Sequence, residues 1–141
     1  MMVLDTDVFI DHFRGQEVAT TYIHNLPADQ RATTDITVME LYKGAANQQE
    51  LATILQFLMH NRVKRLPGST TASQRAVELV HQYGLAHGLG IHDALIAAIA
   101  LEGAHTLVTD LVTDNVRHFR FIPGLHVLRA PYRPSPPSSP I

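Results

Sequence analysis

Residues 93–112 read DALIAAIALEGAHTLVTDLV, and this stretch decides the fold. After Asp93 the segment is almost entirely apolar as far as Glu102, which predicts a helix that is covered on most of its sides and ends at Gly103. Residues 106–112 are β-branched and leucine-rich, which predicts a buried strand. A buried helix that leads directly into a buried strand is typical of α/β proteins.

The rest of the chain repeats this alternation of strand and helix. Further strands are predicted at residues 3–4, 31–34, 63–66 and 125–128. Helices are predicted at residues 7–14, 18–25, 37–46, 48–60 and 71–87. Right-handed crossovers place such helices on both faces of a sheet. We therefore expect a three-layer α/β/α fold around a short, mainly parallel sheet of about four to five strands.

The length of 141 residues fits one domain, which we place at residues 1–130. The remaining residues 131–141 are rich in proline and serine, so we expect a mobile or extended tail there. The first residues carry neither a basic segment nor a long apolar stretch, so no signal peptide is expected. The most apolar run, residues 94–101, is too short to span a bilayer. These features predict a cytoplasmic protein that has no membrane partner.

The composition excludes several kinds of active site. The chain has no cysteine, which rules out disulfides, thiolate zinc sites and a cysteine nucleophile. Its formal net charge is −2, so it is not a protein that coats DNA through bulk positive charge. A nuclease stays possible, because it can bind its substrate through a local patch or through metal ions at the phosphate.

Acidic residues stand at the ends of several predicted strands and at the starts of helices. Asp5 follows the first strand, Glu40 lies in the first turn of the predicted 37–46 helix, and Asp93 opens the central helix. Asp110 or Asp114 ends the strand that begins at residue 106. The carboxyl ends of parallel strands meet at one edge of the sheet, where the carboxylates would repel one another without a cation. Oxygen ligands favour Mg²⁺ or Mn²⁺, and such a site suits phosphodiester hydrolysis.

Each acid also has a purely structural interpretation. Asp5 can cap the helix that follows it, and Asp93 interacts favourably with the dipole of the helix that it opens. The run Thr37-Val38-Met39-Glu40 matches a capping box, and taken alone this spacing favours a capping role for Glu40. The functional interpretation depends on the convergence of all three acids.

Four segments in this order resemble the PIN-domain ribonucleases, and in particular the VapC-type toxins of bacterial toxin–antitoxin pairs. They read LDTDVFID (4–11), TVMELYKGA (37–45), IHDALIAA (91–98) and LVTDNVRHF (111–119), the last followed by IPGL (122–125). The likeness extends from about residue 2 to residue 128. The resemblance implies the α/β/α fold and an endoribonuclease that depends on Mg²⁺ or Mn²⁺. It also implies a role as the toxin of a type II toxin–antitoxin system, with a VapB-like antitoxin as partner and a homodimeric state.

The resemblance also assigns roles to individual residues. Asp5 and Asp93 match the family's main metal ligands, Glu40 matches the acid that completes the catalytic site, and Thr6 matches a small hydroxyl residue beside the first aspartate. Asp7 stands where the family often has asparagine. We interpret Asp7 first as the N-cap of the helix over residues 7–14, and second as a supporting site residue.

The fourth position of the site falls on a local repeat, because Leu107–Asp110 and Leu111–Asp114 both read LVTD. Counted forward from Asp93, the family's Thr-x-Asp/Asn motif falls on residues 109–111, and its usual ligand position holds Leu111. Counted back from residues 116–119, the motif falls on residues 113–115. We assign Asp114 as the fourth catalytic and metal-binding acid, with Asn115 in support and Asp110 in reserve. If the repeat has spoiled this position, the alternative is a catalytically weak PIN-fold module that binds RNA or the antitoxin.

Two further features have a structural and a functional interpretation. The predicted helix over residues 48–60 is amphipathic and is assigned first to the core, with a dimer contact or an antitoxin groove as its second interpretation. His92 and several basic residues near the motifs are assigned first to the solvated surface, and second to contacts with RNA. These basic residues are Arg14, Lys43, Arg117 and Arg120.

Overall fold

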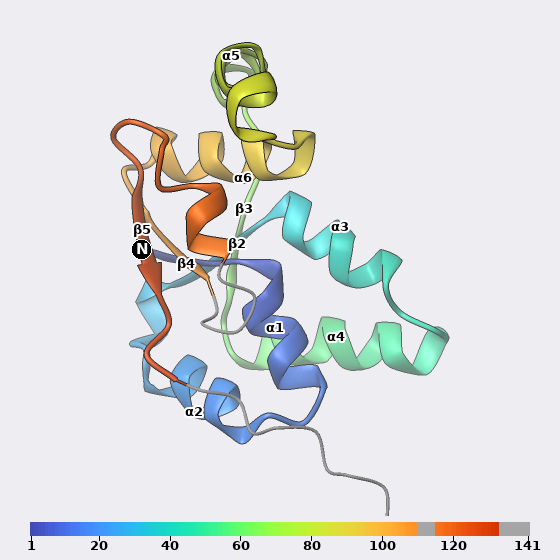
Figure 1. The fold of residues 1–141 in the computed structure, drawn as a ribbon. Helices are drawn as coiled ribbons and strands as arrows, with labels where there is room; N and C mark the ends of the chain where they lie inside the picture. The colour runs from blue at the N-terminus through green and yellow to red at the C-terminus, as the bar shows by residue number, and fades with distance from the viewer. Residues whose placement is uncertain (110–114, 133–141) are drawn as a thin grey trace, which may run out of the picture.

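Five parallel strands form one sheet in the order β3-β2-β1-β4-β5 (Figure 1). The computed structural model describes residues 1–109 and 115–132. The strands are β1 (Met2–Leu4), β2 (Arg31–Thr34), β3 (Lys64–Leu66), β4 (Thr106–Thr109) and β5 (His126–Arg129). The parallel sheet and its strand number confirm the predicted α/β architecture. β1 lies at the centre of the sheet, between β2 and β4, so the residue that follows it is surrounded by other strand ends.

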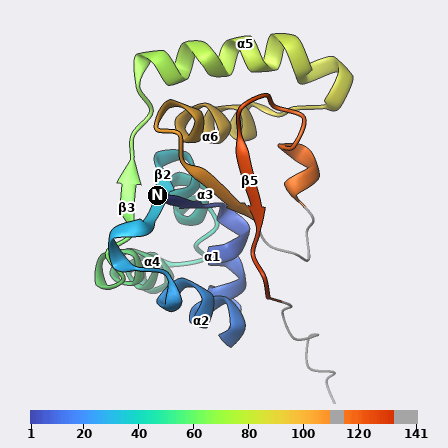
Figure 2. The ribbon, with the colours of Figure 1, turned by 90° about the vertical axis from the view of Figure 1, so that its left-hand side faces the viewer.

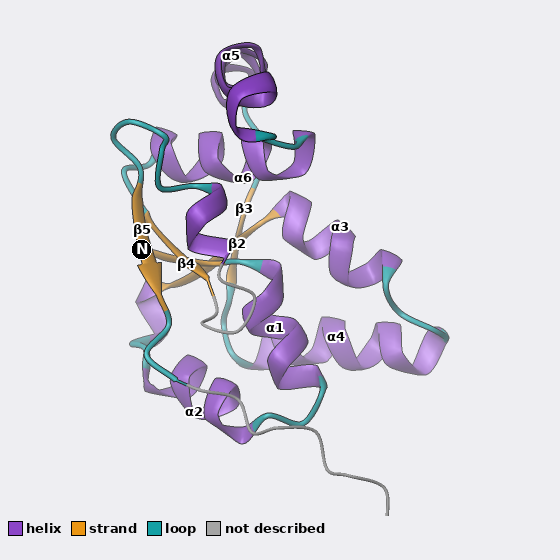
Figure 3. Ribbon diagram, viewed as in Figure 1, coloured by secondary structure: helices purple, strands orange, loops and turns teal. Residues whose placement is uncertain are grey.

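Helices cover both faces of this sheet, as Figures 2 and 3 show. The helices are α1 (Thr6–Phe13), α2 (Glu17–Asn25), α3 (Asp35–Lys43), α4 (Gln48–His60), α5 (Thr70–His87) and α6 (Ile91–Glu102). Two short 3-10 helices, η1 (Ala28–Gln30) and η2 (Asn115–His118), complete the described elements. α5 and α6 lie on one face, α1, α2 and α4 lie on the other, and α3 lies at the edge between α6 and α4.

Alternating side chains of the central strands supply both cores. Val3 and Leu107 belong to the cluster with α5 and α6, whereas Leu4 and Val108 belong to the cluster with α1, α2 and α4. All four side chains are fully buried. Successive side chains of a strand point to opposite faces, and this explains why the central strands read as continuous apolar runs and not as alternating ones.

The predicted helix starts at residues 7 and 37 are wrong, and both corrections concern capping. Asp5, and not Asp7, is the N-cap of α1, and its side chain accepts a hydrogen bond from Thr6 N. Thr34 is the N-cap of α3, and its hydroxyl accepts a hydrogen bond from Thr37 N. Asp7 therefore lies in the first turn of α1, where a negative charge is favourable. Thr37 lies inside α3, so it cannot begin a capping box with Glu40.

Two predictions reach beyond the described residues. The strand predicted at residues 106–112 is observed as β4 up to Thr109, and residues 110–114 lie outside the described part. Of the predicted tail, residues 133–141 also lie outside it. Tyr132 is described, and it is buried: its hydroxyl donates a hydrogen bond of 2.8 Å to Asp11 Oδ2. Within the described part, no helix is long and apolar enough to cross a membrane.

Candidate active site

Asp5 stands at the corner between β1 and α1. Its backbone N–H donates to Val108 O at 2.9 Å, which ties the corner to the neighbouring strand β4. Its carboxylate accepts a hydrogen bond of 2.8 Å from Thr6 N, and the residue is only 4% exposed. Burial raises the pKa of Asp5 to about 8, although the Thr6 N–H opposes this rise. Asp7, Asp93 and Glu40 raise the pKa of Asp5 further, so these negative charges act on one another.

Glu40 reaches the same place from the second turn of α3. Its Oε1 accepts a hydrogen bond of 3.1 Å from the hydroxyl of Thr6. The side chain is 34% exposed, so one oxygen is held by the protein while the carboxylate stays accessible. The capping role that the spacing favoured is therefore wrong, because Glu40 faces α1 and not the start of its own helix.

Asp93 lies in the first turn of α6, at the same edge of the sheet. Burial raises the pKa of Asp93, and Glu40 adds to this rise, whereas His118 and His92 lower it. The N-cap of α6 is Gly90, which has no side chain to donate or accept a hydrogen bond. Asp93 is therefore not the N-cap of α6, and its charge in the first turn is also favourable to the helix dipole.

Two histidines flank these carboxylates. His92 Nδ1 lies 3.9 Å from Glu40 Oε2, and His118 Nδ1 lies 3.9 Å from Asp93 Oδ2. Both side chains are largely exposed, at 69% and 47%. Each histidine is more exposed to solvent than the carboxylate beside it.

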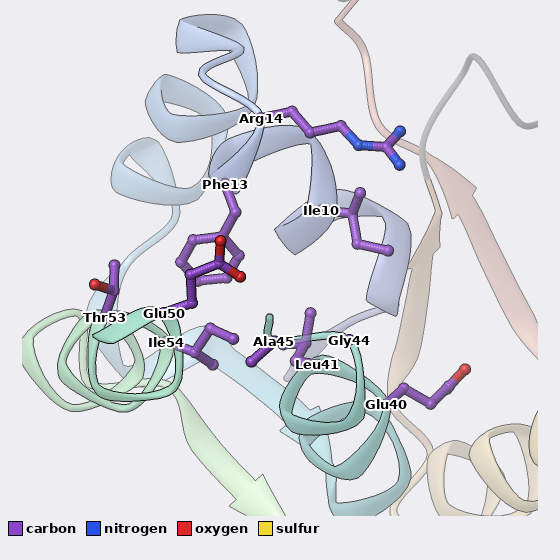
Figure 4. A pocket seen from close by; sticks show the side chains of 10 residues that line it. All are labelled: Ile10, Phe13, Arg14, Glu40, Leu41, Gly44, Ala45, Glu50, Thr53 and Ile54. Carbon is purple, nitrogen blue, oxygen red and sulfur yellow. The ribbon is translucent and has the colours of Figure 1, made fainter. Parts of the chain in front are cut away.

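A groove begins at Glu40 and extends between α1, α3 and α4 (Figure 4). Its volume is about 480 Å³. The walls combine apolar side chains with charged groups at Arg14, Glu40 and Glu50. In the close view, Phe13 and Ile10 of α1 lie opposite Leu41 of α3 and Ile54 of α4. The groove therefore connects the acidic site to the surface of the amphipathic helix α4.

The chemistry of these donors suits a hard divalent cation, because carboxylate oxygens are the ligands that Mg²⁺ and Mn²⁺ prefer. A cation would also relieve the repulsion among the carboxylates, which adds to the effect of burial on the pKa of Asp5. Within residues 1–109 and 115–132, however, no group of three or more histidine, aspartate or glutamate side chains is close enough together to hold a metal ion as it stands. Asp110 and Asp114, and the side chain of Asn115, lie outside the described part.

The family model of the PIN domain matches residues 2–112 of this chain. This chain belongs to the PIN-domain family. Two curated relatives from Mycobacterium tuberculosis are similar to this PIN domain over nearly their full length. Ribonuclease VapC19 is 30% identical over 135 residues, which is 89% of this chain and 97% of the relative. Ribonuclease VapC10 is 27% identical over 133 residues, which is 94% of this chain and 93% of the relative.

Solved structures of toxin–antitoxin complexes share the fold. A complex from Klebsiella pneumoniae matches with a TM-score of 0.72 and 27% identity, and the match covers 91% of this chain and 96% of the other. VapBC-1 from nontypeable Haemophilus influenzae matches with a TM-score of 0.69, 25% identity and the same coverage. VapBC2 from Rickettsia felis, solved with a promoter DNA fragment, has a TM-score of 0.71 at 23% identity, which supports the fold alone.

The PIN domain thus brings three of its predicted site residues to one sheet edge, and Thr6 joins them through its bond to Glu40. Asp7 contributes negative charge from the first turn of α1. Two residues that lie near the acids were not predicted to do so, Thr37 and His118. Thr37 was assigned to the start of its helix. The useful signal was the presence of three threonines, Thr33, Thr34 and Thr37, because more than one of them can serve as the cap.

Proposed function

We propose that this PIN domain is the toxin of a type II toxin–antitoxin system and hydrolyses phosphodiester bonds of RNA in the cytoplasm with the help of Mg²⁺ or Mn²⁺. The observation that carries the proposal is the convergence of Asp5, Glu40 and Asp93 from three elements at one sheet edge, in a chain whose relatives are named VapC ribonucleases. Beyond the effect of burial, Asp93 and Glu40 raise the pKa of Asp5, and like charges brought together from distant parts of a chain are typical of functional sites.

Asp5 and Asp93 are the proposed metal ligands. Asp114 completes the set in this proposal, with Asn115 in support and Asp110 in reserve. A divalent ion bound there would supply a Lewis acid that polarises the phosphate and stabilises the departing alkoxide. Metal binding requires ionised Asp5, so the proton that burial keeps on this carboxyl at neutral pH must leave first.

The protein's own groups carry out the remaining tasks. Glu40 orients the attacking water and accepts its proton, since its Oε1 is held by Thr6 while the rest of the carboxylate is accessible. His92 and His118 lie where they can donate hydrogen bonds to a phosphate oxygen. The buried corner at Asp5 keeps the first carboxylate fixed, because both its backbone N–H and its side chain are hydrogen-bonded.

The proposed protein partner is a VapB-like antitoxin. The groove between α1, α3 and α4 offers it apolar contacts beside charged groups and ends at Glu40, so a segment bound there would cover Glu40. The antitoxins in the structurally similar complexes support this partner class. A homodimer is part of the same proposal and rests on the family resemblance.

The decisive experiment incubates the purified protein with total RNA and Mg²⁺, with and without a chelator, and maps the cut ends. We expect cleavage that the chelator abolishes. Asp5→Asn and Asp93→Asn should each lower cleavage by at least about a hundredfold, because each removes a ligand charge without changing side-chain volume. Asp29→Asn, the same change at an exposed carboxylate of η1, should leave cleavage unchanged.

Undiminished cleavage by either site variant would reject the assignment of the active site. Binding of RNA or antitoxin without any metal-dependent cleavage would instead favour the catalytically weak binding module. That alternative has one observation in its favour, namely that the described acids do not by themselves form a closed metal site.

A further inference from the structure

Threonine hydroxyls gather where β1 and β2 end and α1 and α3 begin. Thr33, Thr34 and Thr37 are buried, with exposed fractions of 1%, 0% and 0%, and Thr6 is partly buried. Two of these hydroxyls have clear structural tasks. The Thr33 hydroxyl donates to Leu4 O at 2.9 Å, and the Thr34 hydroxyl caps α3 by accepting from Thr37 N at 3.1 Å.

The hydroxyls of Thr37 and Thr6 form a short hydrogen-bonded chain that ends on Glu40. Thr6 Oγ1 lies 3.1 Å from Glu40 Oε1 and 3.2 Å from Thr37 Oγ1. A hydroxyl has one proton to donate and can accept further hydrogen bonds. The geometry allows the Thr6 hydroxyl to donate to Thr37 Oγ1 or to Glu40 Oε1, but it has only one proton. A carboxylate can only accept, so when the Thr6 proton goes to Glu40, the Thr37 hydroxyl is left to donate to Thr6 Oγ1. Consecutive bonds of this kind polarise one another and strengthen the last one.

We propose that Thr37 is a positioning residue of the ribonuclease site: its buried hydroxyl orients the hydroxyl of Thr6, which in turn holds Glu40 toward the other carboxylates. The inference rests on the proposed function and deepens it by adding a residue to which the family resemblance gave no role in the site. Thr37 and Glu40 are three residues apart on α3, so they share the face of the helix that packs against α1. Thr37 does not touch substrate or metal in this proposal and acts only through Thr6 and Glu40.

The proposal follows from the conformational freedom that the Glu40 side chain would have without the hydrogen bond from Thr6. Its carboxylate is partly exposed, and the bond from Thr6 restrains one of its oxygens. Without the Thr37 donor, the Thr6 hydroxyl can rotate away from Glu40 or share its proton with water. Glu40 would then sample other rotamers, and its catalytic placement would be lost for part of the time.

The test compares Thr37→Val, which removes the hydroxyl and keeps the shape, with Thr37→Ser, which keeps the hydroxyl. We expect Thr37→Val to lower kcat of metal-dependent RNA cleavage by roughly three- to tenfold with little change in KM, as the loss of one positioning hydrogen bond implies. Thr37→Ser should restore most of the rate. Thr33→Val is the matched control, because it also deletes a buried hydroxyl nearby, and it should keep kcat even if it lowers stability.

A double-mutant cycle separates positioning from a general structural effect. In a Glu40→Gln background, Thr37→Val should have no further effect on the residual rate, because Glu40 is the group through which Thr37 acts. Multiplicative effects of the two changes on kcat, or an equal loss in Thr33→Val, would overturn the proposal. Crystal structures of the wild type and Thr37→Val test the same idea without turnover. We expect the Glu40 carboxylate to lose its hydrogen bond to the Thr6 hydroxyl in the variant. An unmoved Glu40 would refute the positioning role of Thr37, even if the protein proved to have no ribonuclease activity.

Discussion

The carboxylate of Asp5 caps α1 and at the same time faces other carboxylates at the centre of the sheet edge. The sequence presented these as competing interpretations, and the structure shows that one side chain does both. One of its oxygens accepts from Thr6 N, and the carboxylate as a whole still interacts with Asp93 and Glu40. An aspartate that caps a helix can therefore also serve in an active site, since a carboxylate has two oxygens and about four acceptor sites.

The raised pKa of Asp5 predicts how stability depends on pH when no metal is present. The folded protein keeps a proton on this carboxyl up to about pH 8, whereas the unfolded chain releases it near the ordinary pKa of 3.8. The free energy of unfolding should therefore fall as the pH rises from about 4 to about 8, with a slope of at most about 1.4 kcal/mol per pH unit from this group. Asp93 shifts in the same direction and adds to the effect.

Urea unfolding in the presence of a chelator at several pH values measures this slope. Asp5→Asn should reduce it, because asparagine caps a helix as well as aspartate does but has no proton to lose in this range. Asp29→Asn should keep the wild-type slope. If the free energy of unfolding of Asp5→Asn fell with pH as steeply as that of the wild type, Asp5 would not be protonated in the folded state.

Glu40 and Thr37 show what residue spacing cannot decide. A threonine followed three residues later by glutamate fits a capping box, but it equally fits two residues on one helix face. The choice depends on where the preceding strand ends, and β2 ends at Thr34, which takes the cap. That strand end is fixed by pairing with β1 and β3, which is a tertiary contact.

At the scale of elements, the apolar pattern was a reliable guide to the existence of helices and strands. β2 and α4 have the predicted bounds, because both lie between clear breaks in the pattern. The N-termini of α1 and α3 were displaced, since both follow runs of aspartate and threonine in which several residues can serve as the cap. At α6 the helix begins two residues before Asp93, and the exposed Ile91 gave no polar signal for that start.

The N-cap of α3 offers an element-scale prediction. Thr34→Ala should lower the free energy of unfolding by about 1–2 kcal/mol, because it leaves the buried N–H of Thr37 without a partner. Asn47→Ala removes the N-cap of α4, where the N–H of Glu50 is exposed and can turn to water. It should cost less, about 0.5–1 kcal/mol. Urea titrations of both variants measure the two losses, and a Thr34→Ala variant as stable as the wild type would disprove the capping assignment.

For the molecule as a whole, the strand order determines which strand ends, and therefore which acidic residues, lie next to one another. The alternation of strands and helices predicted that the acids lie at strand ends, but it did not predict which ends are neighbours. The order β3-β2-β1-β4-β5 places β1 between β2 and β4 and thereby brings the Asp5 corner between the start of α3 and the end of β4. The repeated LVTD could not be resolved by counting, because both of its aspartates fit one motif, and both lie outside the described residues.

The central claim is that Asp5 and Asp93 are ligands of a divalent metal ion beside Glu40, and calorimetric titration of Mn²⁺ into the purified protein at pH 8 tests it most directly. We expect binding by the wild type and by Asp29→Asn that strengthens from pH 6 to pH 8, because the buried Asp5 must lose its proton. Asp5→Asn and Asp93→Asn should bind Mn²⁺ at least about tenfold more weakly while keeping their circular dichroism spectrum. Wild-type affinity for Mn²⁺ in both variants would contradict the account.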